Sequence, residues 1–145
     1  MRAPEPGSFQ SVNVEDLPWR PSTMASGVFV KDIAVTDGWE MQLVRFEPGA
    51  RLPAHSHERP EFLFILEGQL VQAGRRMGPG WASVAGAGTV DDDVYSDTGC
   101  VFVLVDRVNR DNVRVLKLSQ RLRLSAGQIR DFQRHRTAGQ FGLFG

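Results

Sequence analysis

The sequence predicts an all-β protein, a sandwich or barrel built from short antiparallel strands. Short apolar runs rich in β-branched and aromatic residues recur along the chain, and glycine or proline separates most of them. No segment before residue 107 shows helical periodicity. This spacing is typical of all-β folds. The expected strands cover residues 28–30, 33–35, 41–46, 62–66, 70–73, 81–85 and 101–105.

Length and composition limit the number of domains and the classes of protein to which the chain can belong. A chain of 145 residues fits one domain, and 41% hydrophobic residues are enough to form a core. No apolar stretch approaches the roughly 20 residues of a membrane span, and the N-terminus lacks the layout of a signal peptide. Cys100 is the only cysteine, which excludes an intrachain disulfide and a cysteine-built zinc finger. We therefore expect a soluble, cytoplasmic protein without a membrane partner.

Three segments divide the chain. Residues 1–26 are expected to form an extended arm, because four prolines among the first 21 residues exclude a helix. Trp19 is an aromatic residue that could anchor this arm to the body. Residues 27–106 contain the predicted strands and form the expected barrel. Residues 107–145 form a C-terminal extension with a further predicted strand around 113–118 and, after a capping-box pattern at residue 125, a helix over about 126–136.

The formal net charge of zero hides a strong asymmetry. Residues 1–106 carry 8 Lys+Arg against 15 Asp+Glu, a net charge of −7, whereas residues 107–145 carry 9 against 2, a net charge of +7. The basic extension could follow nucleic-acid phosphates, but it contains no recognised binding motif. We favour its docking onto the acidic body or onto a second copy in a homodimer, and we do not expect a nucleic-acid partner.

A pair of histidines and a glutamate carry the clearest chemical signal. His55 and His57 are two residues apart, so in a strand their imidazoles point to the same side. Glu61 begins the next predicted strand on an otherwise apolar inner face, where a lone carboxylate is costly without a counter-charge or a metal. Two imidazoles and a carboxylate suit a divalent ion such as Fe(II), Mn, Zn or Ni. A His-x-His pair is also common among structural and surface histidines.

The segment from Gly49 to Gly68 resembles the first motif of the cupins, Gly-x5-His-x-His-x3-Glu-x6-Gly, at every fixed position. The resemblance implies a double-stranded β-helix, or jelly-roll barrel, with one divalent metal ion inside, held by His55, His57 and Glu61. The Trp19 arm and the strand after Gly99 further resemble the cupin domain of ChrR-type anti-sigma factors and its stand-alone relatives.

The second cupin motif, Gly-x5-Pro-x-Gly-x2-His-x3-Asn, is altered in this chain. Gly80 and Gly88 fit the pattern, but Asp91 stands where the motif has histidine. An alignment backwards from Gly99 places Asp92 there instead. Asp91 or Asp92 is therefore a candidate fourth ligand, and a solvated acidic turn is the competing interpretation. A second carboxylate would make the site harder and favour Mn or Fe(II).

Two functions from different classes follow from the resemblance. One is a metal-dependent dioxygenase or isomerase acting on a small organic molecule such as a diketone or an aryl ketone. The other is a non-catalytic metal- or ligand-sensing cupin of the ChrR regulatory type, and a barrel that has lost its metal is a third interpretation. The enzymes of this outline use a third histidine, which the chain replaces with aspartate.

Two further residues are candidates for lining a substrate pocket. Tyr95, the only tyrosine, follows the acidic run and could donate a proton, although a strand aromatic is the simpler interpretation. Arg51 could clamp an anionic ligand, or it could form a surface ion pair. Cys100 is expected to pack as a small strand residue.

Overall fold

The computed structural model describes residues 2–108 and 113–115. This part of the chain is almost entirely β-structure, with one short 3-10 helix, η1 (Val14–Asp16). The strands are β1 (Arg20–Pro21), β2 (Val28–Thr36), β3 (Trp39–Phe46), β4 (Arg51–Leu52), β5 (His55–His57), β6 (Glu61–Gly68), β7 (Leu70–Gln72), β8 (Arg75–Met77), β9 (Ala82–Ala85), β10 (Val90–Asp91), β11 (Val94–Tyr95), β12 (Cys100–Arg107) and β13 (Val113–Val115).

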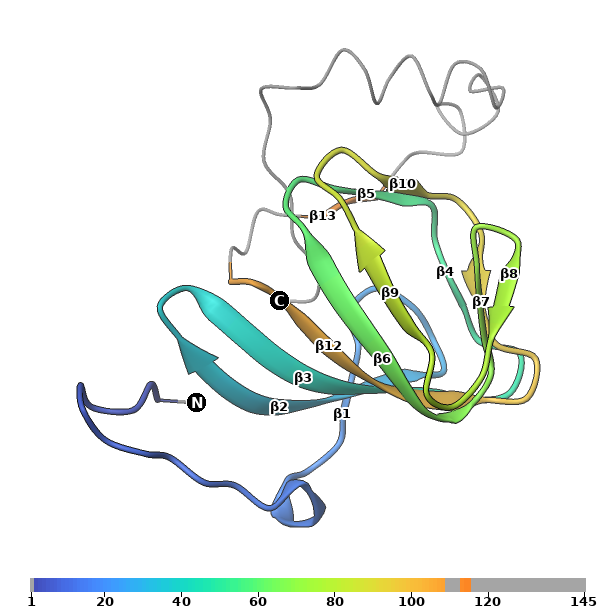
Figure 1. The fold of residues 1–145 in the computed structure, drawn as a ribbon. Coiled ribbons are helices and arrows are strands. Elements are labelled where there is room, and N and C mark those ends of the chain that lie inside the picture. The colour runs from blue at the N-terminus through green and yellow to red at the C-terminus, as the bar shows by residue number, and fades with distance from the viewer. Residues whose placement is uncertain (1, 109–112, 116–145) are drawn as a thin grey trace.

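The strands form three antiparallel sheets that curve around one core (Figure 1). The largest has the order β1-β2-β3-β12-β6-β9, and the other two have the orders β4-β11-β7-β8 and β10-β5-β13. Strands far apart in the sequence are neighbours, because β12 lies between β3 and β6. This non-sequential order confirms the predicted all-β fold of the jelly-roll type.

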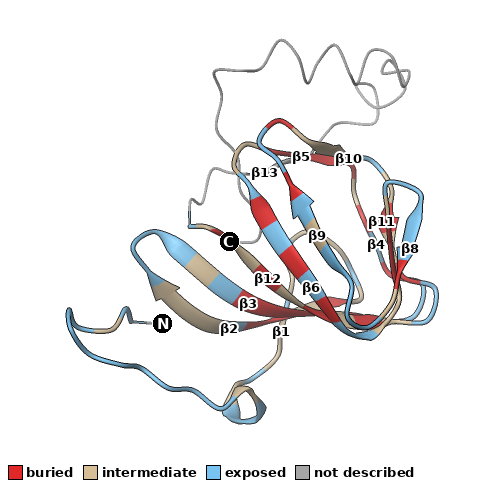
Figure 2. Cartoon of the chain, in the orientation of Figure 1, coloured by how far each residue is buried: buried red, intermediate tan, exposed pale blue. Residues whose placement is uncertain are grey.

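Alternation along the strands places the core. Side chains of β6 and β12 are alternately buried and more exposed, as Figure 2 shows for β6. Successive side chains of a strand point to opposite faces, so one face of each strand looks into the barrel. The inner faces supply a contiguous apolar cluster that includes Val30, Val44, Phe46, Ile65 and Phe102.

Gly68, the last fixed glycine of the first cupin motif, is required by a close approach of two backbones. A Cβ atom at this position would lie 2.0 Å from the carbonyl oxygen of Gly99. The φ of Gly68 is also +69°, in the left-handed region that favours glycine. The close contact lets β6 end against the start of β12, so this motif glycine serves the packing of the barrel.

The N-terminal arm is anchored as Trp19 predicts. The Trp19 ring lies 4.9 Å from Lys31 Nζ and 4.5 Å from Arg45 Cζ, both on strands of the large sheet. Lys31 Nζ also donates to the carbonyl oxygen of Val14, and Arg20 forms a two-pronged ion pair with Asp32 at 2.7 and 2.8 Å. These contacts hold the arm against the sheet.

The predicted strands are found, with differences that have simple causes. The runs 28–30 and 33–35 belong to one strand, β2, whose register shifts between Asp32 and Ala34. The strands β1, β4, β8, β10 and β11 were not predicted, because two or three residues are too few to show a period. The strand expected near residue 113 is β13, which pairs with β5. The predicted helix over 126–136 lies outside the described residues.

Within the described residues, no helix is long and apolar enough to cross a membrane. The cytoplasmic location stays a prediction.

Candidate metal centre

Strand β5 holds His55 and His57 side by side inside the barrel. Both side chains are fully buried, and their ring centroids are 5.0 Å apart. The strand pairs with β10 on one side and with β13 on the other, so its position is fixed from both edges. Figure 1 shows these three strands together at one end of the barrel. The His-x-His spacing therefore directs two imidazoles to one point, as predicted.

Strand β10 brings Asp91 to the same point. Asp91 is the register partner of His55, and directly opposed residues of an antiparallel pair point to the same face. Asp91 Oδ2 lies 2.8 Å from His57 Nε2 and 3.7 Å from His55 Nε2. One ligand atom from each of His55, His57 and Asp91 lies within 4.8 Å of the others, and all three residues are buried. We call these three residues the His-His-Asp cluster.

The local backbone fixes the tautomer of His55. Its Nδ1 lies 2.8 Å from the carbonyl oxygen of Pro53, so Nδ1 carries the proton and donates it. The lone pair of Nε2 then faces the cluster, where Nε2 is buried without a hydrogen-bond partner. Burial, and next the neighbouring His57, lower the pKa of His55 to about 4. His55 is therefore neutral near pH 7 and presents an unprotonated nitrogen, the form in which histidine binds metals.

Asp91 is held in its ionised form. Burial acts to raise its pKa, but the hydrogen bond with His57, the two nearby imidazoles and a hydrogen bond from Gln72 together lower it. Gln72 Nε2 donates to Asp91 Oδ2 at 3.1 Å, and Ser83 Oγ in turn donates to Gln72 Oε1 at 2.8 Å. The chain Ser83–Gln72–Asp91 thus orients the carboxylate.

Glu61 lies on the other side of His57. Its Oε2 is 3.6 Å from His57 Nδ1, too long for a hydrogen bond, and both atoms are buried without a hydrogen-bond partner. Burial raises the pKa of Glu61 well above its usual value, and the nearby carboxylates of Asp106 and Asp91 raise it further. Without a cation nearby, burial therefore favours the neutral acid form of Glu61 over the charged form. The structure brings it beside the cluster, adjacent to His57.

The sequence interpretation missed three residues that shape this end of the barrel: Gln72, Ser83 and Asp106. Asp106 is fully buried near Glu61, at the end of β12. Strict alternation of buried residues at 100, 102, 104 and 106 places it on the inner face, and that period could have identified it. Gln72 and Ser83 had no signal, because they come from strands of three and four residues.

A pocket of about 240 Å³ is lined by Asp91 of the cluster. Strands β7, β8 and β9 provide most of its walls. Its lining residues include Gln72, Arg75, Met77, Ser83 and Thr89. A small molecule can therefore approach the buried carboxylate from this side.

The other predicted site residues lie elsewhere. Asp92 is exposed, so of the two alternative aspartates the structure brings only Asp91 to the cluster. Arg51 and Tyr95 are register partners, and the guanidinium of Arg51 lies 4.4 Å from the centre of the Tyr95 ring. Arg51 also forms an ion pair with Asp93.

The face of the sheet that carries Arg51 and Tyr95 is the outer one. Their strand neighbours Leu52 and Val94 belong to the buried core, and neighbouring residues in a strand point to opposite faces. Of the two interpretations of Arg51 offered by the sequence, the structure shows the surface ion pair, which forms with Asp93. A ligand-binding role for Arg51 or Tyr95 stays a prediction.

The cluster suits a metal ion. His55 Nε2 has no hydrogen-bond partner, His57 lies between the carboxyl groups of Glu61 and Asp91, and Asp91 is ionised, all in a buried space. Buried polar atoms without partners are costly, and a cation bound by these donors would remove that cost. His55, His57 and Asp91 could therefore hold a metal ion, as the predicted site of two histidines and acidic residues requires.

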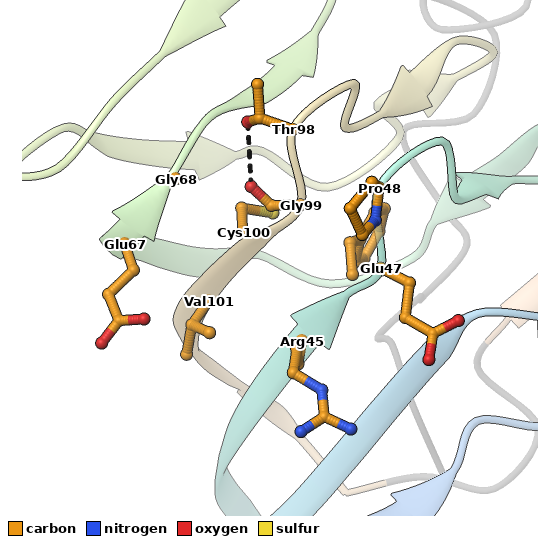
Figure 3. A pocket seen from close by; sticks show the side chains of 10 residues that line it. Arg45, Glu47, Pro48, Glu67, Gly68, Thr98, Gly99, Cys100 and Val101 are labelled. Atoms are coloured by element: carbon orange, nitrogen blue, oxygen red, sulfur yellow. Dashed lines mark hydrogen bonds between the residues drawn. The ribbon is translucent and has the colours of Figure 1, made fainter.

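A second pocket, of about 340 Å³, lies at the opposite end of β6. Figure 3 shows its lining around Gly68, Gly99 and Cys100, with Thr98 Oγ1 donating to the Gly99 carbonyl oxygen. Burial raises the pKa of the Cys100 thiol to about 11, so this cysteine is not an activated nucleophile. Cys100 belongs to the buried core cluster, as expected from the sequence.

Residues 8–108 match the family model of the ChrR cupin-like domain. The match covers the described barrel and most of the N-terminal arm. No curated protein sequence matches the chain.

Solved cupin structures share the fold. A protein proposed to be an acetylacetone dioxygenase from Methylibium petroleiphilum aligns with a TM-score of 0.70 and 15% identity, over 82% of this chain and 88% of that one. The polyketide cyclase RemF from Streptomyces resistomycificus aligns with a TM-score of 0.66 and 20% identity, over 87% and 94%. The Rhodobacter sphaeroides complex of SigE with the anti-sigma ChrR aligns with a TM-score of 0.57 and 21% identity, over 64% and 51%.

Proposed function

The chain belongs to the family of ChrR cupin-like domains, and from that premise we propose that it is a single-domain metal-binding cupin. One divalent ion, Fe(II), Mn, Zn or Ni, would be held by His55, His57 and Asp91. Glu61 would be a fourth donor only after its side chain or the His57 ring turns, because Glu61 lies at Nδ1 and Asp91 at Nε2 of His57. The observation that carries the proposal is the fixed, buried and unpartnered Nε2 of His55, aimed at an ionised carboxylate.

The donor set favours particular ions. Two histidines and one carboxylate with open positions are the ligands of non-haem Fe(II) oxygenases. Glu61 adds a second carboxylate, and hard oxygen donors further favour Fe(II) or Mn over copper. An ion at this place would also lower the cost of ionising Glu61, whose pKa is raised by burial and by neighbouring acids.

We assign to this centre the chemistry of a metal-dependent dioxygenase, or of an isomerase, acting on a small organic molecule such as a diketone or an aryl ketone. The bound ion would supply Lewis acidity toward two oxygen atoms of the substrate and a centre for O2 chemistry. Neutral His55 and ionised Asp91 hold their donor atoms in place, and Gln72 orients Asp91. The pocket of about 240 Å³ admits the substrate. The structural likeness to a proposed acetylacetone dioxygenase and to a polyketide cyclase supports this substrate class.

Oxygen uptake tests the enzymatic function. The Fe(II)-loaded protein should consume O2 with at least one member of a panel of diketones and aryl ketones. The His55→Ala/His57→Ala variant should consume none above the rate of free Fe(II). Uptake that is equal in both proteins would contradict a catalytic centre at these histidines.

A regulatory function is the second candidate, because the matching family is that of the ChrR cupin-like domain. This chain spans about half of the aligned chain in the complex of SigE with ChrR. A sensor of this type would bind the metal or a ligand without turnover and act through a protein partner. A metal-loaded protein without O2 uptake on the whole panel, but with a ligand-dependent shift in its melting temperature, would favour the sensor.

A homodimer is supported by the outer face of the large sheet. Six large apolar side chains lie exposed on β3, β6 and β9: Trp39, Met41, Phe62, Phe64, Leu66 and Val84. Register pairs connect them, since Val105 of β12 lies between Met41 and Phe62, and Phe62 opposes Val84. Together they expose roughly 500 Å² of surface, which is about the apolar share of a standard interface.

We propose that a second copy of the chain covers this face. Light scattering after gel filtration should give the mass of a dimer, and Phe64→Glu should convert it into a monomer, whereas Arg51→Glu on another sheet should not. A monomeric wild-type protein would contradict the dimer.

A further inference from the structure

We propose that the ligand of the metal centre carries a carboxylate, or an equivalent anionic group, which pairs with Arg75 at the wall of the pocket. This inference rests on the proposed metal-binding function and adds the charge of the substrate and the residue that selects it. The observations come from the β7–β8 hairpin, which separates its two neighbouring arginines onto opposite faces of the sheet.

The direction of Arg75 follows from the strand register. Arg75 is the register partner of Gln72, and Met77 is the partner of Leu70. Leu70 and Met77 both belong to the buried core, so the residues at 70, 72, 75 and 77 share the inner face. Gln72 reaches Asp91 from this face. Arg75 therefore extends from the same side of the hairpin as the residue that orients a metal ligand.

Arg76 points the other way. It is the register partner of Val71, which is in turn the partner of Tyr95 on the outer face. Its guanidinium forms an ion pair with Asp97 at 3.1 Å and donates to Gln69. The charge of Arg76 is therefore compensated at the surface, and this residue does not line the pocket.

The charge of Arg75 is available to a ligand. Its guanidinium lies 5.8 Å from the centre of the Trp81 ring, and within residues 2–108 no carboxylate forms an ion pair with it. Arg75 and Asp91 line the same pocket of about 240 Å³. A divalent ion beside Asp91 and a guanidinium at the wall would place two positive groups along one small space, which favours an anionic occupant.

The size and lining of the pocket narrow the ligand further. A volume of about 240 Å³ is below the range of pockets for drug-sized molecules, so the occupant is a small molecule. Met77 and Ala85 add apolar wall, while Ser83 and Thr89 add hydroxyl groups. A short-chain oxo-acid would fit these features, with its oxo groups toward the ion and its carboxylate toward Arg75.

A matched pair of ligands tests this inference. Pentane-2,4-dione and 2,4-dioxopentanoate differ in one terminal group, a methyl in the first and a carboxylate in the second. Calorimetric titration of the metal-loaded wild-type protein should give a dissociation constant about tenfold lower for 2,4-dioxopentanoate. Arg75→Gln should remove that preference and leave the affinity for pentane-2,4-dione within about twofold. Arg76→Gln should keep the preference of the wild-type protein.

The outcomes separate this inference from the function on which it rests. Metal content is measured first in all proteins, including His55→Ala/His57→Ala. A wild-type protein that binds no more metal than the double variant overturns both the proposed function and the inference. Normal metal content with the same preference in Arg75→Gln and Arg76→Gln overturns the role of Arg75 alone. The same holds if the metal-loaded wild-type protein does not prefer 2,4-dioxopentanoate.

Discussion

The two ends of the barrel use the same strands for different purposes. Where β6 ends, Gly68 approaches Gly99 closely and Cys100 packs in the core, beside a surface pocket of about 340 Å³. Where β6 begins, Glu61 lies beside His57, and buried nitrogen and oxygen atoms lack hydrogen-bond partners. Within the described residues, buried polar atoms without hydrogen-bond partners therefore gather at the second end, around His55, His57 and Glu61. That difference locates the candidate metal centre.

We expect the largest loss of stability when the close approach of Gly68 to Gly99 is blocked. Gly68→Ala would place a methyl group 2.0 Å from the Gly99 carbonyl oxygen, at a φ of +69°. We expect a loss of about 4 kcal/mol in the free energy of unfolding, or no folded protein. Gly74→Ala is the matched control, because its φ is +74° but nothing lies within 4 Å of the added Cβ. It should cost only about 1 kcal/mol in urea unfolding. Equal losses would contradict the role of the close approach.

At the polar end, two neighbouring aspartates should behave differently. Asp91 is 5% exposed and belongs to the His-His-Asp cluster, whereas Asp92 is exposed. Asp91→Asn should weaken metal binding by about a hundredfold, or about 2.7 kcal/mol, in competition with a chelator. Asp92→Asn should change the affinity by less than about twofold. A larger loss of metal affinity in Asp92→Asn than in Asp91→Asn would identify Asp92, and not Asp91, as the ligand.

The pH dependence of the metal-free protein reports on Glu61. Its pKa is higher in the folded protein than in the unfolded chain, so the folded state binds the proton more tightly. The stability of the metal-free protein should therefore fall as the pH rises from the ordinary pKa of a glutamate through the raised folded value. Glu61→Gln should remove this loss and make the metal-free protein more stable near pH 8 by about 2 kcal/mol. Urea unfolding at pH 5 and pH 8 measures the free energy of unfolding of both metal-free proteins. If the stability of the wild-type protein and of Glu61→Gln falls equally with pH, the loss is caused by a group other than Glu61.

Gln72 should have a smaller effect, because it contacts a ligand and not the ion. Its amide donates to Asp91 Oδ2 at 3.1 Å and accepts from Ser83 at 2.8 Å. Gln72→Ala should lower the metal affinity about tenfold. Ser83→Ala removes only the outer hydrogen bond and should have a weaker effect in the same direction. A metal affinity unchanged in both variants would exclude the Ser83–Gln72–Asp91 chain as a positioning element.

The residues at the two ends of the barrel could be predicted from the sequence to different extents. The first cupin motif identified His55, His57 and Glu61, because a strand period of two and one short loop determine where those side chains lie. It also contains Gly68, whose role becomes visible only in the structure, since a close approach to Gly99 depends on a residue 31 positions later. The choice between Asp91 and Asp92 likewise required the register of β10 against β5, because neighbouring residues in a strand face opposite sides.

The pocket walls could not be predicted in this way. Gln72, Arg75 and Ser83 come from three short strands, and no local period tells which face each residue occupies. The pairing of Gln72 with Arg75 between β7 and β8 shows that both residues lie on the same face. Arg51 shows the converse, because its position four residues before His55 suggested a site residue, while its pairing with Tyr95 places it on the outer face.

The most direct test of the central claim is elemental analysis of protein purified without added metal, beside the His55→Ala/His57→Ala variant. The account predicts close to one equivalent of a transition metal in the wild-type protein and less than about a tenth of that in the variant. Anomalous scattering from crystals of the wild-type protein should place the ion among His55, His57 and Asp91. Equal and negligible metal in both proteins would contradict the account.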